Sequence, residues 1–160
     1  MNVFIGMKVP REDQSLRRAA DLLFATVGSA GHQPFVATDE IARRQLKDPN
    51  DFMPFVRDAL RDMDLVIVLH HAELRGGLIE AGIAYAWDLP IWLCRRPDER
   101  VSSSMQGCAD MIIEYDDLDD LHDKLVNRLT KESIAQELCG TKVQGKMTKA
   151  RPSEGSCQKV

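Results

Sequence analysis

The sequence lacks the charge balance of several classes of protein. Basic residues are not in excess: 21 Lys and Arg stand against 25 Asp and Glu, for a net charge of −4. Domains that bind nucleic acid or an anionic membrane usually carry a clear basic excess. We therefore expect a small molecule as the ligand, with neither nucleic acid nor membrane as a partner.

Long apolar runs and targeting signals are also missing. The longest apolar runs, such as Leu65–Leu69, are far shorter than the roughly 20 residues that cross a bilayer. The N-terminus has no basic stretch followed by an apolar one, so we expect no secretory signal. The four cysteines show no CxxC spacing, and without such a signal they are expected to be reduced thiols. These absences predict a cytoplasmic protein.

The 160 residues have the composition of one ordinary globular domain, with 44% hydrophobic and 29% charged residues. The end of the chain differs, because residues 130–160 hold six basic and three acidic residues and almost no aliphatic residue after Leu138. Such a segment cannot bury enough surface to order itself. We predict a domain over residues 1–129, then over 130–160 the end of a helix and a basic tail that is disordered from Gly140 to Val160.

The body of the chain alternates apolar strands with amphipathic helices. The predicted strands are Val3–Ile5, Pro34–Ala37, Leu65–Leu69, Pro90–Cys94 and Met111–Ile113. The predicted helices are Arg11–Val27 (ended by Gly28), a segment capped by Asp51 that runs to about Leu60, Gly76–Trp87 and Leu118–Leu129.

Strands separated by helices predict right-handed βαβ crossovers. Leu65–Leu69 is apolar on both faces, which is typical of a central parallel strand. The expected fold is a doubly wound α/β three-layer sandwich, with a five-stranded parallel sheet in the flavodoxin-like or Rossmann-like order 2-1-3-4-5. In this order ligands bind beyond the carboxyl ends of strands 1 and 3, which here are Gly6-Met7-Lys8 and His70–Gly77.

One carboxylate stands at this predicted edge. Glu80 follows Gly76 and Gly77, whose backbone amides can come close to a ligand. We expect Glu80 in the first turn of its helix, where the macrodipole favours the ionised form that a carboxylate nucleophile needs. From spacing alone, a Glu that only complements the dipole is an equal alternative. The glycine pair belongs to neither a GxxxxGK[ST] nor a GxGxxG motif.

A set of motifs surrounds Glu80. An Asp-led apolar strand at Asp64 is followed by Arg75-Gly76-Gly77-Leu78-Ile79-Glu80-Ala81-Gly82 and by a Pro-led strand at Leu89-Pro90-Ile91. This pattern resembles the nucleoside 2-deoxyribosyltransferase superfamily, over roughly Val3–Leu129. The opening strand with Gly6, followed by Arg11-Glu12-Asp13-Gln14, and the segment Arg100–Met105 are similar to its branch of 2′-deoxynucleoside 5′-monophosphate N-glycosidases.

The resemblance implies that Glu80 attacks the anomeric carbon of a nucleoside or nucleoside 5′-monophosphate and expels the base. The glycosyl-enzyme intermediate then reacts with water or with another base, as in retaining glycosidases. The segment Arg100–Met105 favours the hydrolase slightly. The resemblance further implies that Ser103 contacts the 5′-phosphate, often from a neighbouring subunit, that the protein is a homodimer or higher homo-oligomer, and that no metal or organic cofactor takes part.

Three positions where that family places polar groups are apolar here. Val3 stands in place of a Tyr, Met7 in place of a Ser of the N-glycosidase branch, and Val56 in place of a second carboxylate. Asp58 is the nearest acid and a weak candidate for acid/base catalysis, because two residues along a helix turn it by about 200°. These departures leave a second function open, a nucleotide-binding sensor or regulatory protein with little or no catalysis.

Side chains at the predicted edge complete the candidates. Lys8 or Arg75 is suited to pair with a phosphate. His70 and His71 are adjacent at a strand end, so their side chains should point to opposite faces and a shared metal is not expected. A flavodoxin-like signalling domain is a third alternative, but Met7-Lys8-Val9 replaces the acidic cluster of receiver domains. The proposed substrate-binding residues are Gly6, Met7, Lys8, His71, Gly76, Gly77 and Ser103.

Overall fold

Five parallel strands form one sheet in a computed structural model that describes residues 1–7, 13–72 and 74–140, with side chains up to residue 131. The order is β2-β1-β3-β4-β5, so the predicted topology is confirmed. The strands are β1 (Asn2–Gly6), β2 (Gln33–Val36), β3 (Leu65–Leu69), β4 (Ile91–Arg95) and β5 (Met111–Glu114).

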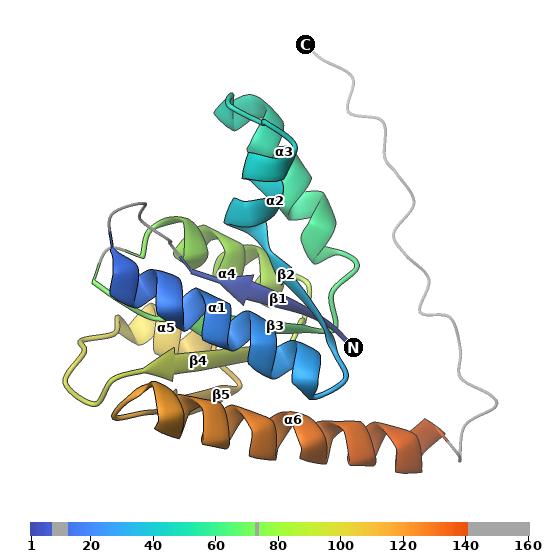
Figure 1. Cartoon of the computed structure of the whole chain (residues 1–160). Helices are drawn as coiled ribbons and strands as arrows, with labels where there is room; N and C mark the ends of the chain where they lie inside the picture. Colours follow the sequence, from blue (N-terminus) through green and yellow to red (C-terminus); the bar gives the residue numbers. More distant parts are fainter. Residues whose placement is uncertain (8–12, 73, 141–160) are drawn as a thin grey trace.

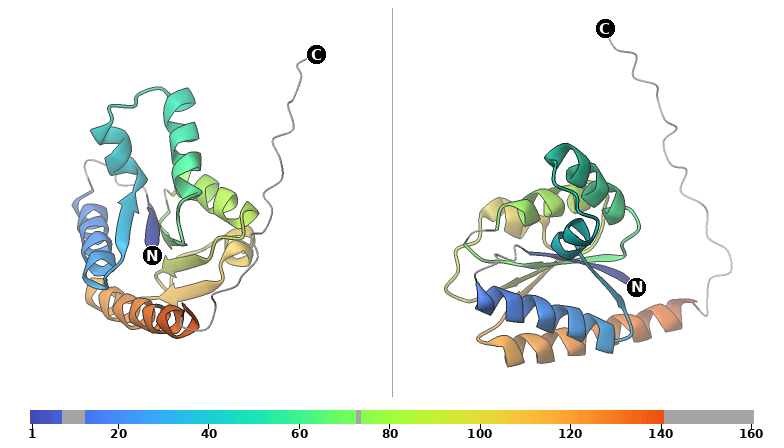
Figure 2. Two further views of the ribbon diagram at one scale, coloured as in Figure 1. Left: turned by 90° about the vertical axis from the view of Figure 1, so that its right-hand side faces the viewer. Right: turned by 45° about the horizontal axis from the view of Figure 1, so that its top comes forward.

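Helices cover both faces of the sheet (Figures 1 and 2). Helices α1 (Gln14–Ser29) and α6 (Leu118–Gly140) lie on one face. The other face carries α2 (Ala37–Arg43), α3 (Pro49–Leu60), α4 (Gly76–Ala86) and α5 (Ser103–Cys108). The result is the expected three-layer sandwich.

Alternation along β1 divides its side chains between two cores. Val3 and Ile5 are fully buried in the core beneath α1 and α6, which Met7 also joins. Phe4 lies in the core beneath α2–α5, where its ring stacks on Phe35 at a centroid distance of 5.4 Å. By the same alternation Gly6 faces the α4 side of the sheet. All five residues of β3 are buried, as expected for a central strand.

The ends of two helices differ from the sequence prediction. Asp13 caps α1 by accepting hydrogen bonds from the amides of Ser15 and Leu16, and Gly28 lies inside this helix. The chain leaves α1 at Gly31, whose φ of +81° is the conformation that favours glycine. Asp48, and not Asp51, caps α3, because Pro49 occupies the first helical position.

Two short helices were not expected, and one predicted helix is longer. Helix α2 begins at Ala37, which was assigned to a strand, and α5 begins after Ser102, whose hydroxyl accepts a hydrogen bond from the Met105 amide. Segments of six or seven residues are too short to show helical periodicity. Helix α6 continues beyond Leu129 to Gly140, and the predicted tail over residues 141–160 lies outside the described residues.

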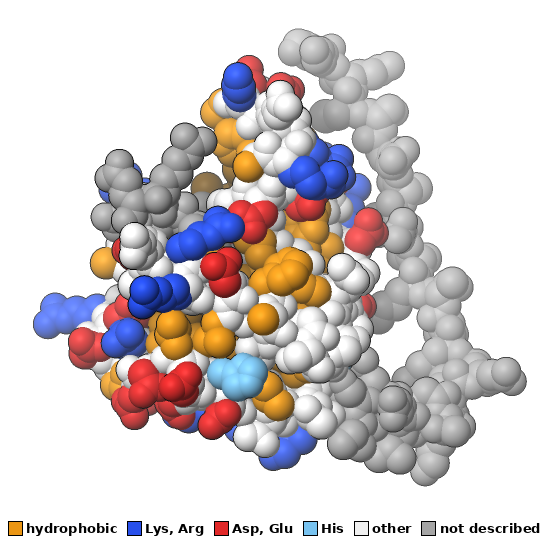
Figure 3. Space-filling view, in the orientation of Figure 1, with side chains coloured by type: hydrophobic (Ala, Val, Ile, Leu, Met, Phe, Trp, Pro, Cys, Tyr) orange, Lys and Arg blue, Asp and Glu red, His pale blue; other side chains and the backbone are white. Residues whose placement is uncertain are grey.

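The surface gives no sign of a single-sign charged face on the side seen in Figure 3. Acidic side chains gather near the start of α6, where Asp119 and Asp120 lie in the first turn, and basic side chains are interspersed elsewhere. Within the described part of the chain, no helix combines the length and the apolar character needed to cross a membrane.

Candidate functional site

The carboxyl ends of β1 and β3 lie side by side, as the topology predicts. Gly6, the last residue of β1, pairs with Val68 of β3. This is the position at which the winding of a 2-1-3-4-5 sheet reverses, and ligands bind there in proteins of this topology. Both strand ends therefore belong to the candidate site.

Glu80 reaches this edge from the second turn of α4. The helix begins at Gly76, so its first turn holds Gly76, Gly77, Leu78 and Ile79, and no acidic residue. The expectation of a first-turn Glu is thus wrong. Because the influence of the macrodipole falls off within the first turn, it cannot be the main influence on the charge of this carboxylate.

The Glu80 carboxylate lies against the backbone of β1. A Cβ placed on Gly6 would be 3.3 Å from Glu80 Oε2, and its other nearest neighbours would be at ordinary contact distance. The missing side chain at position 6 therefore makes the space that the carboxylate occupies. The structure brings together two of the residues that the sequence singled out separately.

Burial controls the ionisation of Glu80. It raises the pKa of this carboxyl from its ordinary value to about 7. No hydrogen bond or ion pair from the described residues opposes this effect. The predicted preference for the ionised form is reversed, since loss of water outweighs the helix dipole. At neutral pH the group is close to the midpoint of its titration.

The two glycines before Glu80 have different roles. A Cβ on Gly77 would lie 2.5 Å from Cδ1 of Leu74, a buried core residue. A side chain at position 77 would therefore force Leu74 to move within the core. Gly76 is exposed and a Cβ there would meet nothing within 4 Å.

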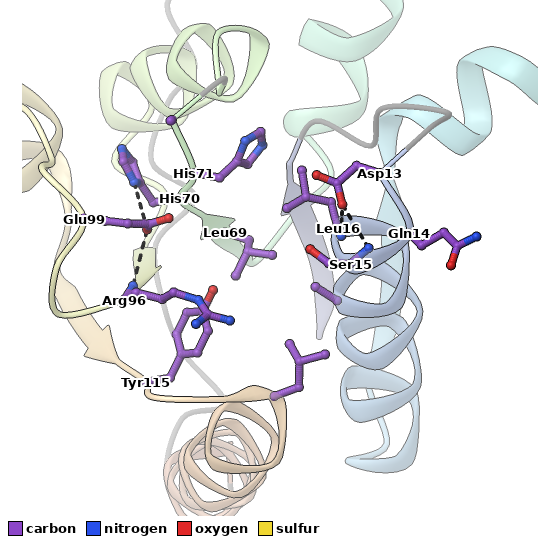
Figure 4. A pocket seen from close by; sticks show the side chains of 13 residues that line it. Asp13, Gln14, Ser15, Leu16, Leu69, His70, His71, Arg96, Glu99 and Tyr115 are labelled. Atoms are coloured by element: carbon purple, nitrogen blue, oxygen red, sulfur yellow. Dashed lines mark hydrogen bonds and ion pairs between the residues drawn. The ribbon is translucent and has the colours of Figure 1, made fainter.

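A cleft of about 1010 Å³ opens at the same edge, on the side of α1 and α6 (Figure 4). It is formed where α1 begins and where β3, β4 and β5 end. Its lining residues are Asp13, Gln14, Ser15, Leu16, Ala19, Leu69, His70, His71, Ala72, Arg96, Glu99, Tyr115 and Leu118. Of the proposed substrate-binding residues, His71 lines this cleft, whereas Glu80 approaches from the other face of the sheet.

Polar side chains in the cleft come from loops that are distant in sequence. His70 Nδ1 lies 3.2 Å from Glu99 Oε2, and the Arg96 guanidinium lies 5.8 Å from the centre of the Tyr115 ring. His71 points toward Asp13 on the opposite wall (Figure 4). The two histidine side chains thus point to different walls of one cleft, and not to opposite faces of the sheet as predicted. The sequence places Arg96 beyond the end of its strand on the ligand side of the sheet, but sequence reasoning missed Glu99 and Tyr115, because no local motif marks them.

The three apolar departures are core residues. Val3 and Met7 are buried beneath α1 and α6, and Val56, a residue of α3, is buried in the core on the other face of the sheet. The Val3 side chain and the Glu80 carboxylate therefore lie on opposite faces of the sheet. Asp58 is exposed, and its carboxylate pairs with Arg57 at 2.8 Å. The geometry gives no support to acid/base catalysis by Asp58.

The remaining candidates lie at the surface or outside the described residues. Ser103 is the first residue of α5 and is exposed, while Ser102 serves as the cap. Arg75 is exposed at the cap position of α4 and makes no side-chain cap. Lys8 lies outside the described residues. Thr38, which the sequence did not single out, has an enclosed hydroxyl without a hydrogen-bond partner.

No family model and no curated protein sequence matches the chain. Solved structures do. A CMP N-glycosidase from Clostridium botulinum aligns with a TM-score of 0.65 at 17% identity, over 80% of this chain and 99% of that one. A 2-deoxyribosyltransferase from Bacillus psychrosaccharolyticus aligns with a TM-score of 0.57 at 15% identity, over 76% and 90%.

Another similar structure is the sugar isomerase domain of an RpiR transcription factor from Sphaerobacter thermophilus. Its TM-score is 0.54 at 16% identity, over 86% of this chain and 74% of that one. Identities this low concern the fold alone, and one fold can serve several functions. The chain has the fold of a CMP N-glycosidase and a 2-deoxyribosyltransferase, as its resemblance to the nucleoside 2-deoxyribosyltransferase superfamily predicted.

Proposed function

We propose that the protein cleaves the N-glycosidic bond of a nucleoside or nucleoside 5′-monophosphate, with Glu80 as the nucleophile. The observation that carries this proposal is the Glu80 carboxylate, which lies partly buried against Gly6 with no partner in the described part of the chain. Buried carboxylates with a raised pKa occur often at functional sites. The shared fold agrees with this activity.

The chemistry follows from the environment of Glu80. Its ionised carboxylate attacks C1′ of the sugar, the bond to the base breaks, and the base takes up a proton as it leaves. Water then attacks C1′, replacing the Glu80 ester with a hydroxyl and regenerating the carboxylate. A second base in place of water gives transfer. A carboxylate without an ion pair is ready to stabilise the positive charge that develops at C1′.

Glu80 does not line the cleft, but the cleft opens at the same edge of the sheet and is large enough for the part of the substrate that extends beyond the sugar. Its volume of about 1010 Å³ is at the upper end of the usual range for small-molecule sites. Arg96 is a cation in its lining, and it is suited to pair with a 5′-phosphate. The substrate contacts that we propose besides Glu80 are Gly6, Met7, Lys8, His71, Gly76, Gly77 and Ser103.

The test is release of free base from a panel of nucleosides and nucleoside 5′-monophosphates, followed by chromatography. Half of the reactions contain a second free base, so that transfer products separate from hydrolysis. Glu80→Gln keeps the shape of the side chain and removes its negative charge, and Glu80→Ala removes the whole group. We expect both variants to lose activity by about 10³-fold or more. Release that survives in Glu80→Ala would show that another group attacks the sugar.

The second candidate function is a nucleotide-binding sensor without turnover. It is favoured by Val3, Met7 and Val56, which are packed into the two cores where the related enzymes have polar groups. This candidate predicts that nucleotides bind with a measurable affinity while no member of the panel yields free base. Calorimetric titration of the same panel separates the two functions.

A further inference from the structure

Two polar groups without partners lie on the α2–α5 side of the sheet. One is the Glu80 carboxylate, which no described residue pairs with. The other is the Thr38 hydroxyl in α2, which is enclosed and makes no hydrogen bond to any described residue. Buried polar side chains are nearly always hydrogen-bonded, so an exception calls for an explanation such as a ligand.

The sheet register places Thr38 beside the end of β1. Ile5 of β1 pairs with Val36, the last residue of β2. Gly6 follows Ile5 at the end of β1, while Ala37 and Thr38 follow Val36 as the first two residues of α2. Helices α2 and α4 both contact β1, and both cover the same face of the sheet (Figure 2). The start of α2, with Thr38 as its second residue, therefore lies within roughly one to two strand spacings, about 5–10 Å, of the end of β1, where the Glu80 carboxylate rests.

The charges around Thr38 select the kind of ligand group. Asp39 and Glu40 follow it in α2, and Glu80 is the acid across the end of β1. The nearby cations are already paired: Arg17 with Asp39, and Arg43 and Arg44 with Glu40. The described residues around Thr38 therefore offer a phosphate no free cation. A neutral hydroxyl of the ligand fits, because a threonine hydroxyl can both donate and accept a hydrogen bond.

We propose that Thr38 contacts a hydroxyl of the substrate's sugar and so decides which sugar the site accepts. This inference rests on the proposed function, in which Glu80 attacks C1′. The 2′- and 3′-hydroxyls are the two hydroxyl groups of a nucleoside 5′-monophosphate, and both lie within a few Å of C1′. An enclosed hydroxyl left without its partner discriminates strongly against an analogue that lacks the matching group.

Thr38→Val removes the hydroxyl and keeps the shape of the side chain. Because this hydroxyl has no partner in the fold, we expect the melting temperature of the ligand-free variant to equal or exceed that of the unchanged protein. Thr26→Val is the matched control. Thr26 is fully buried and its Oγ1 lies 2.7 Å from His122 Nδ1, so this variant should melt at a lower temperature.

Binding is measured by calorimetry in the Glu80→Gln background, with ribo-, 2′-deoxyribo- and 3′-deoxyribonucleoside 5′-monophosphates of one base. Adding Thr38→Val should weaken the tightest of these ligands about tenfold. The same change should leave unaffected the analogue that lacks the contacted hydroxyl. Thr38→Ser, which keeps the hydroxyl, should retain most of the affinity, and Thr26→Val should not alter the preference among sugars.

Three outcomes would overturn the proposal. The first is a melting temperature of Thr38→Val as low as that of Thr26→Val. The others are an equal loss of affinity for all three nucleotides on adding Thr38→Val, or no binding of any of the three. Failure of the proposed function gives a different result. In that case the unchanged protein releases no base, while nucleotide binding still depends on Thr38 and on the sugar.

Discussion

The carboxylate of Glu80 occupies the space that a side chain at position 6 would need, with Oε2 at 3.3 Å from the site of a Gly6 Cβ. Gly6 of β1 thereby determines the position of the Glu80 carboxylate of α4. This contact joins β1 to α4 at the reversal point of the sheet, and it is the basis of the first prediction.

Gly6→Ala should reduce activity with little loss of stability. The new methyl group would push Glu80 Oε2 by a few tenths of an ångström, while its contacts to Val68 and Ile67 stay ordinary. Small displacements of a reacting group lower rates strongly, so we expect a fall in kcat of about 10- to 100-fold. Gly82→Ala is the control, because a Cβ there meets nothing within 4 Å. Equal kcat values in steady-state assays of the two variants would remove the positioning role of Gly6.

Activity should rise as the pH increases through about 7. Burial raises the pKa of Glu80 to about 7, and the proposed nucleophile must be ionised. The profile of kcat/KM against pH, measured from pH 5 to 9, should therefore climb and level off near pH 8. A profile that instead falls through this range would indicate that Glu80 acts in its protonated form, as a general acid.

Stability should depend on pH in the opposite direction. The pKa of Glu80 is higher in the folded protein, at about 7, than its ordinary value of 4.5. The folded state therefore holds its proton more tightly, and the resulting stability is fully present below about pH 4.5 and is lost as the pH rises through about 7. The full effect is on the order of 3 kcal/mol.

Glu80→Gln isolates this contribution, since it cannot ionise. The free energy of unfolding of the variant, relative to the unchanged protein, should increase between pH 4.5 and pH 8 in denaturant titrations. A constant difference across this range would mean that burial does not perturb Glu80.

Gly77→Ala should destabilise the fold. The added Cβ would lie 2.5 Å from Leu74 Cδ1 and 3.0 Å from Leu74 Cγ, which is closer than such atoms can pack. Overpacking of this kind usually costs about 1–3 kcal/mol. Gly76→Ala, where space is open, should leave the free energy of unfolding nearly unchanged. Urea titration of both variants checks the difference, and similar values would show that Leu74 moves aside freely.

Much of the fold could be predicted from local patterns. The apolar run Leu65–Leu69 indicated a central strand, and strands alternating with helices indicated the order of the sheet. Both follow from rules that act over short stretches of chain. The short helices α2 and α5 could not be predicted in this way, because they are held by tertiary contacts rather than by periodicity.

The candidate site likewise has features that local patterns predict and features that they do not. The position of Glu80 at the reversal point of the sheet was accessible from sequence, since it depends on strand ends and one motif. Its ionisation was predicted with the wrong sign, because a pKa depends on burial by residues distant in sequence. The unpaired hydroxyl of Thr38 gave no sequence signal, and of the cleft between α1 and the ends of β3–β5 the sequence indicated only the wall that follows β3.

The sequence by itself determined the order of the strands and the edge of the sheet at which Glu80 stands, because periodicity and chain connectivity are properties of the chain. Only the tertiary structure decided that Glu80 rests on Gly6, that its carboxyl titrates near neutrality, and that Thr38 is enclosed without a partner. These properties arise from packing between segments far apart in sequence, and packing is what excludes water from a charge.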